Sequence, residues 1–170
     1  WDADYPARAA FLGTLLRESR VPVRTVLDLG CGTGTIAWAL FRQGFRVIAA
    51  DSSGEMLTEA VRKGDDVNPP PGDVPPPLFI CQSMPRLKLA APVDGVVSTL
   101  DSLNYLTRER DLRETFRRVF DEWGFDLVKL DFLYGAAPFG TETESRAARM
   151  CRAMNILRRS EERRAGKECR

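Results

Sequence analysis

Apolar positions along the first 135 residues alternate between short continuous runs and runs spaced three or four residues apart. Short runs bounded by polar residues are typical of strands buried on both faces, and the wider spacing is typical of amphipathic helices. The pattern predicts helices over residues 8–20, 33–43, 54–63 and 108–123, and strands over 25–29, 46–50, 78–81, 94–99 and 125–132. Because the two kinds of element alternate, we expect a parallel sheet with right-handed crossovers.

Helical spacing also predicts which side chains face the core. In the first helix the apolar positions are Ala9, Phe11, Leu12, Leu15 and Leu16. In the helix over residues 108–123 they are Leu112, Phe116, Val119 and Phe120, with charged residues between them. Gly44 is expected to end the second helix, and the proline-rich residues 68–77 are expected to form a stiff surface loop.

A glycine-rich turn follows the first predicted strand. Asp28 comes two residues before Gly30, and Gly32 and Gly34 continue a G-x-G-x-G spacing into the next helix. Glycines allow a sharp turn and a close approach of a ligand, and the first amides of the helix point to the same place, which favours a nucleotide-like ligand. The spacing differs from the G-x-G-x-x-G of dinucleotide sites, and an acid at Asp28 would repel a pyrophosphate. Asp51 ends the next strand, where a ribose-binding carboxylate is expected.

These residues resemble the first two motifs of the Rossmann-like S-adenosylmethionine-dependent methyltransferases. Further similarity in residues 51–57, 79–84 and 93–106 extends the resemblance over residues 2–120. It implies an α/β fold, a doubly wound parallel sheet of about five strands in the order 3-2-1-4-5. It also implies S-adenosyl-L-methionine as cofactor and methyl transfer to a small-molecule substrate. Ser53 would cap the third helix, with Met56 and Leu57 on its inner face.

The resemblance also implies which residues hold the cofactor. Asp28 and the turn would hold the methionine portion, Asp51 the ribose, and Met56 with Met84 the adenine. The full set is Tyr5, Asp28, Gly30, Cys31, Gly32, Gly34, Asp51, Ser52, Met56, Ser83, Met84 and Leu100. Ser83 stands where many members of the family have an aspartate. No catalytic residue is identified; Asp101, Asn104 and Tyr105 are candidates for substrate contact, and their alternative is a capped loop.

The carboxyl-terminal part does not continue the resemblance. No antiparallel strand pair follows the fifth predicted strand, and residues 141–164 predict one charged helix. Residues 121–157 resemble a fragment of an α-galactosidase barrel, with Asp131 at the nucleophile position, and the last 12 residues resemble a translated sequencing-adapter tail. We therefore predict a cofactor-binding domain over 1–135 and a carboxyl-terminal helix and tail over 136–170, with foreign sequence joined to the methyltransferase part near residue 120. The alternatives to an active methyltransferase are an incomplete, non-catalytic cofactor-binding module and, remotely, an α-galactosidase fragment.

The composition of the chain limits which kinds of binding partner are expected. The chain has 25 basic and 24 acidic residues, so its charge gives no case for nucleic acid or an anionic membrane surface. Histidine is absent and the four cysteines form no C-x-x-C pair, so no metal site is expected. The cysteines are expected to be free, buried thiols in a reducing cytoplasm. No apolar run approaches a membrane-spanning length. An uncovered fifth strand would favour self-association through the sheet edge.

Overall fold

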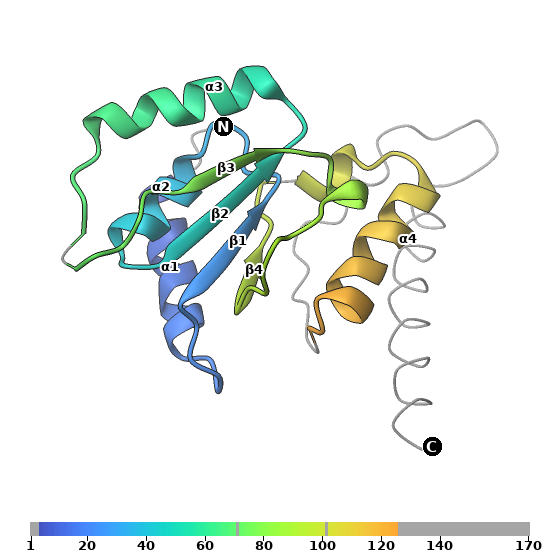
Figure 1. Ribbon diagram of the computed structural model, residues 1–170, viewed down its shortest axis with the longest axis horizontal. Coiled ribbons are helices and arrows are strands. Elements are labelled where there is room, and N and C mark those ends of the chain that lie inside the picture. The colour runs from blue at the N-terminus through green and yellow to red at the C-terminus, as the bar shows by residue number, and fades with distance from the viewer. Residues whose placement is uncertain (1–3, 71, 101, 126–170) are drawn as a thin grey trace. The chain divides into compact units, whose positions relative to one another are not determined.

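The computed structural model describes residues 4–70, 72–100 and 102–125 (Figure 1). The chain divides into two compact units, Trp1–Thr99 and Leu100–Arg170. Each is described by itself.

A parallel sheet forms the centre of the first unit. Its strands are β1 (Thr25–Leu29), β2 (Arg46–Asp51), β3 (Leu78–Cys81) and β4 (Gly95–Val97), in the spatial order β3-β2-β1-β4 (Figure 1). This order confirms the predicted α/β fold and its strand sequence 3-2-1-4. The register places Asp28 opposite Ala49 on one side and Val97 on the other. The fifth predicted strand lies outside the described residues, apart from its first residue.

Three helices accompany the sheet: α1 (Tyr5–Arg17), α2 (Thr35–Arg42) and α3 (Gly54–Arg62), the last continued by a 3-10 turn over Lys63–Asp66. Since side chains alternate along a strand, the helices meet one set of alternate strand residues. The buried cluster joins Ala9 of α1 and five residues of α2 to Phe45 and these strand residues: Val26, Val47, Ala49 and Val97. The core beside β1 and β2 therefore fixes where the ends of both strands lie.

Several element boundaries differ from the prediction, including the end of the first helix at Arg17 in place of residue 20, and three of the differences have local reasons. The first helix begins earlier, at Tyr5, because the Asp4 side chain accepts a hydrogen bond from the backbone N–H of Ala7 and Pro6 follows. The second helix begins at Thr35, since Gly34 has a left-handed backbone that a helix cannot include. The fourth strand is shorter than 94–99, because the Asp94 carboxylate accepts two backbone N–H bonds at the start of β1.

The apolar stripe predicted for the first helix is only partly buried. Ala9 is buried and Leu12 and Leu16 pack against the core, but Phe11 and Leu15 are exposed. Helical spacing of apolar residues therefore predicted a wider buried face for α1 than the face that packs against the core.

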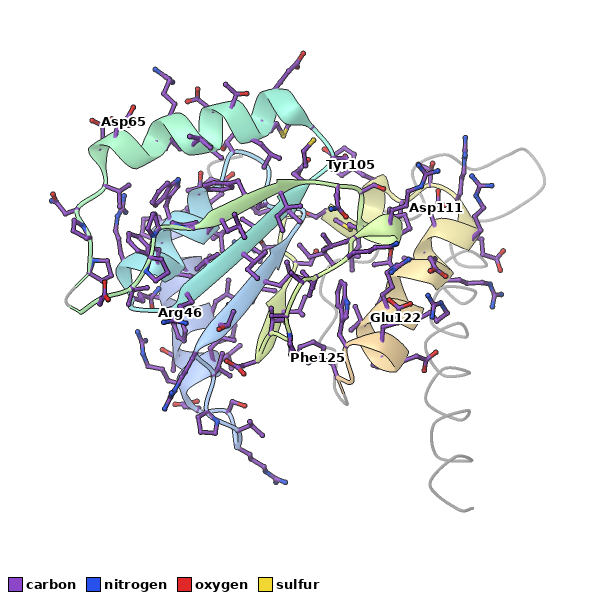
Figure 2. All side chains as sticks on the ribbon, in the orientation of Figure 1. Arg46, Asp65, Tyr105, Asp111, Glu122 and Phe125 are labelled. Carbon is purple, nitrogen blue, oxygen red and sulfur yellow. The ribbon has the colours of Figure 1, made fainter. Side chains whose placement is uncertain are left out.

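The second unit contains a short 3-10 turn (Ser102–Tyr105), α4 (Glu109–Arg117) and a π-helical turn (Arg118–Glu122). All four predicted inward residues of this helix are buried, namely Leu112, Phe116, Val119 and Phe120. The prediction of one regular helix to residue 123 is wrong at its end, where the π turn replaces it. Figure 2 shows Asp111 and Glu122 on this helical segment.

Several predictions lie outside the described residues: the helix over 141–164, Asp131, the adapter-like tail, and the boundary at residue 135. Asp101 also lies outside them. Among the helices that the structure describes, none is both long and apolar enough to cross a membrane.

Candidate functional site

The glycine turn joins the carboxyl end of β1 to α2. Backbone N–H groups of Gly30 and Cys31 both donate to the Ala50 carbonyl of β2, at 2.8 and 3.1 Å, and Gly34 donates to the Cys31 carbonyl at 3.0 Å. The three glycines have φ angles of 80°, 54° and 71°, which L side chains adopt only with strain. Arg46 marks the opposite, amino end of β2 in Figure 2. The turn is thus built from the residue type that its backbone requires.

The Asp51 carboxylate fastens this turn to the end of β2. One oxygen, Oδ2, accepts a hydrogen bond from the backbone N–H of Gly32 at 2.9 Å, and Oδ1 accepts one from Ser53 at 2.9 Å. A carboxylate has about four acceptor positions, so about two remain for a ligand. Asp51 can therefore shape the turn and accept ligand hydroxyl groups at the same time.

Asp28 presents the opposite situation, a buried carboxyl group without a partner. The residue is 1% exposed, and neither carboxyl oxygen has a hydrogen-bond partner in the structure. Burial, and secondarily the charge of Asp51, raise the pKa of Asp28 to about 7, although the backbone amide of Ala37 acts in the other direction. An unpaired buried carboxylate is costly, and a cationic ligand group would relieve that cost.

Cys31 lies between the first two glycines and is half-buried. Burial raises the pKa of its thiol, and the charges of Asp28 and Asp51 raise it further. Since the thiolate is the nucleophilic form, this thiol is suited to lining the turn rather than to covalent chemistry. Cys81 differs from the expected buried thiol, because it lies on the outer strand β3 and is exposed.

The start of α3 lies beside the turn. Ser53 caps the helix as predicted, its hydroxyl oxygen accepting a hydrogen bond from the Met56 N–H at 3.2 Å. The prediction that Met56 and Leu57 both face inward is wrong for Met56, which is 47% exposed, whereas Leu57 is buried. The Met56 sulfur lies 3.7 Å from where a Cβ on Gly32 would stand. Met56 thus flanks the middle of the turn instead of the core.

The other predicted residues divide into two groups. The carbonyl of Ser52 faces the Cys81 sulfur at 3.8 Å, and Gln82 donates to the Asp51 carbonyl at 2.9 Å, so the chain entering Ser83 and Met84 starts beside Asp51. Tyr5 and Leu100 lie in other parts of the chain. Tyr5 is the first residue of α1, and Leu100 begins the second unit with a left-handed backbone, φ 55°.

Sequence reasoning missed the contacts of Ser98 and Lys63, and the buried Nε atom of Arg8. Arg8 in α1 has a buried Nε atom without a hydrogen-bond partner. Ser98, just after β4, donates its hydroxyl to the Leu29 carbonyl at 2.8 Å. Lys63 donates from Nζ to the hydroxyl oxygens of Thr33 and Thr35, at 2.8 and 3.0 Å. A charged residue beside Ala9, within an apolar stripe, was a signal for Arg8; the other two contacts join distant residues that no local pattern relates.

A metal ion has no evident binding place in the part of the chain that the structure describes. Within residues 4–70, 72–100 and 102–125, no three acidic or cysteine side chains gather in positions that could hold one. The chemical groups described at the turn are its backbone amides, its two aspartates and the methionine beside it.

The chain is similar in sequence to proteins of the methyltransferase family. Residues 26–122 match the model of the methyltransferase domain family. The chain is 34% identical over 153 residues to "Putative methyltransferase GWCH70_2453" of Geobacillus sp. (strain WCH70), covering 84% of this chain and 60% of that protein. It is 41% identical over 105 residues to "Putative methyltransferase YqeM" of Bacillus subtilis (strain 168), covering 61% of this chain and 40% of that protein. The chain thus spans only about half the length of these relatives.

A solved structure shares the fold. An S-adenosylmethionine-dependent methyltransferase from Clostridium acetobutylicum ATCC 824 aligns with a TM-score of 0.60 and 30% identity, over 71% of this chain and 46% of that one. The matched segment of the family model contains the glycine turn, Asp51 and all four strands except the first residue of β1. Because that segment makes up more than half of the sequence, this chain belongs to the methyltransferase domain family.

Proposed function

We propose that the chain binds S-adenosyl-L-methionine at the glycine turn and transfers its methyl group to a small-molecule acceptor. The observation that carries the proposal is the contact between Asp51 and the amide of Gly32, which holds an acid for ligand hydroxyls against the turn. The unpaired Asp28 beneath the same turn supports it, since the cofactor carries an ammonium and a sulfonium group.

The residues present fit the separate parts of this cofactor. Asp28 offers negative charge to the methionine ammonium. The free acceptor positions of Asp51 suit the two ribose hydroxyls. The exposed Met56 side chain, lying against Gly32, offers a polarizable surface to the adenine ring.

The chain's contribution to the reaction is positioning. When bound, the cofactor supplies an electrophilic methyl group on a positively charged sulfur, and an acceptor already nucleophilic needs only alignment with it. Fixed turn amides and Asp51 hold the donor in one orientation, and effective molarity supplies most of the acceleration. Residues 1–170 contain no histidine, and their carboxylates and tyrosines are the candidates we consider for a proton acceptor.

The first prediction concerns cofactor binding. Titration calorimetry of the full chain should detect S-adenosylmethionine and its demethylated product. Asp51→Ala should weaken both by about 1.5–3 kcal/mol, roughly 10- to 150-fold, the value of a hydrogen bond to a charged group. The exposed Asp73→Ala serves as a matched control and should bind as the unaltered chain does. Binding of NAD without binding of either sulfur compound would refute the proposal.

The second candidate is a cofactor-binding module without transfer activity. The matched region covers only 60% and 40% of the two relatives, and their remaining residues have no counterpart in the match. This partial coverage supports the second candidate. Transfer of a labelled methyl group to a panel of amines, hydroxyls and carboxylates separates the two. Turnover abolished by Asp51→Ala supports the enzyme, and cofactor binding without any turnover supports the module.

A further inference from the structure

Two acids lie at the same edge and on the same face of the sheet. Asp28 is paired with Ala49 across β1 and β2, and Asp51 comes two residues later along β2. Side chains two residues apart along a strand share a face, so both carboxyl groups lie on the side where α2 packs. Strand spacing and rise place their Cα atoms about 8 Å apart. The negative charge of Asp51 therefore opposes ionisation of Asp28.

The two acids differ in what surrounds them. Asp51 accepts two backbone N–H bonds, whereas Asp28 accepts none and is almost completely buried. The repulsion and the burial therefore act on Asp28, which is the member of the pair that can least support a charge.

Among the residues that the structure describes, no cation forms an ion pair with Asp28. The turn contributes the Cys31 thiol, whose raised pKa keeps it neutral. On α2 the nearest contribution is the backbone amide of Ala37, and Val97 of β4 is apolar. Arg8 on α1 forms no ion pair with Asp28, and Lys63 is hydrogen-bonded to the hydroxyls of Thr33 and Thr35.

We infer that Asp28 holds a proton in the ligand-free site and releases it when the positively charged cofactor binds. The inference rests on the proposed function and adds to it a protonation state for the site. The exchange is balanced: the O–H bond of Asp28 breaks, the proton passes to solvent, and the carboxylate then faces the charge of the cofactor. A carboxyl group that titrates near neutral pH can make this exchange under ordinary conditions.

The consequence is an affinity that falls as the solution becomes more acidic. Below pH 7 the cofactor has to displace a proton, so its dissociation constant rises by up to about tenfold for each pH unit. Between about pH 7.5 and pH 6.0 we expect roughly eightfold weaker binding of S-adenosylmethionine. Asp28→Asn, which has no proton to release, should lose this dependence, whereas the exposed Asp73→Asn should keep it.

Carbon-13 carboxyl NMR of the ligand-free full chain tests the first half of the inference without any variant. We expect the Asp28 resonance to titrate near pH 7. A resonance that titrates near pH 4 would overturn the inference, whatever the cofactor does.

Calorimetry at about pH 6.5 in buffers of different ionisation enthalpy tests the second half, because the buffer reports protons set free. We expect between half a proton and one proton released for each S-adenosylmethionine bound by the unaltered chain, and none by Asp28→Asn. Binding without proton release would overturn the inference and leave the proposed function standing. If S-adenosylmethionine does not bind at any pH, both fail. The unaltered chain alone decides each outcome if the variant does not fold.

Discussion

At the scale of single residues, the glycines of the turn are not equivalent. A Cβ on Gly34 would stand 2.9 Å from the Ala60 Cβ and 3.0 Å from the Phe79 ring, whereas a Cβ on Gly32 would meet only the Met56 sulfur at 3.7 Å. Gly34 is thus required by close packing between α2, α3 and β3. Gly32 is required by its backbone angle and by the ligand that the turn is proposed to hold.

This difference predicts stability losses of different size for the two alanine substitutions. Gly34→Ala should lower the free energy of unfolding by about 2–4 kcal/mol, since overpacking adds to the backbone strain. Gly32→Ala should cost only about 1–2 kcal/mol in stability, but it should weaken S-adenosylmethionine binding more strongly than its stability loss suggests. Urea unfolding and calorimetry of both variants check this. Equal stability losses would contradict the packing argument.

At the scale of elements, a side-chain hydrogen bond links β1 to the chain after β4, beyond the last paired residues of the two strands. The β1–β4 register ends with Asp28 opposite Val97, and the next residue of β4's chain, Ser98, reaches the Leu29 carbonyl with its hydroxyl. The β1–β4 backbone pairing therefore ends at the carboxyl edge, where strand order reverses and ligands bind in open α/β sheets. The Ser98 hydroxyl holds the carbonyl of the residue that precedes Gly30.

Ser98→Ala should therefore weaken cofactor binding by about 1 kcal/mol, roughly fivefold, because the Leu29 carbonyl loses a fixed donor. Ser98→Thr keeps the hydroxyl and should restore the affinity. Calorimetric titration of the two variants gives the comparison, with unfolding measurements to separate positioning from stability. If threonine fails to restore what alanine loses, the hydroxyl is not what positions the turn.

At the scale of the whole molecule, the sequence predicted the strand order but not every contact at the strand ends. Three strands were placed within a residue of their observed bounds, because continuous apolar runs bounded by glycine, proline or charge leave little choice of register. The contact of Ser98 with Leu29 was missed because it joins residues 69 apart in sequence, and the exposure of Met56 was missed because helical spacing does not show how α3 sits against the turn. The unpaired state of Asp28 likewise required the packed structure around it.

Buried Asp28 also gives global stability a definite pH dependence. Its folded pKa is about 7 against an ordinary value of 3.8, so between those values the folded chain binds more protons than the unfolded one. Stability from this residue is complete below about pH 4 and is lost as the pH rises to about 7, by up to about 1.4 kcal/mol for each pH unit. Relative to Asp28→Asn, the unaltered chain should thus weaken across this window. Parallel denaturant midpoints for the two chains from pH 4 to 8 would contradict it.

The loop before β3 has a consequence for sheet growth. Pro75, Pro76 and Pro77 directly precede this four-residue strand, which has β2 as its one neighbour among the described strands. Prolines have no N–H to donate, so a foreign strand arriving beside β3 would find hydrogen-bonding groups over only a few residues. Short edges next to prolines are a common protection against fibril-like stacking. On this side, the proline run limits how far the sheet can serve as a template for aggregation.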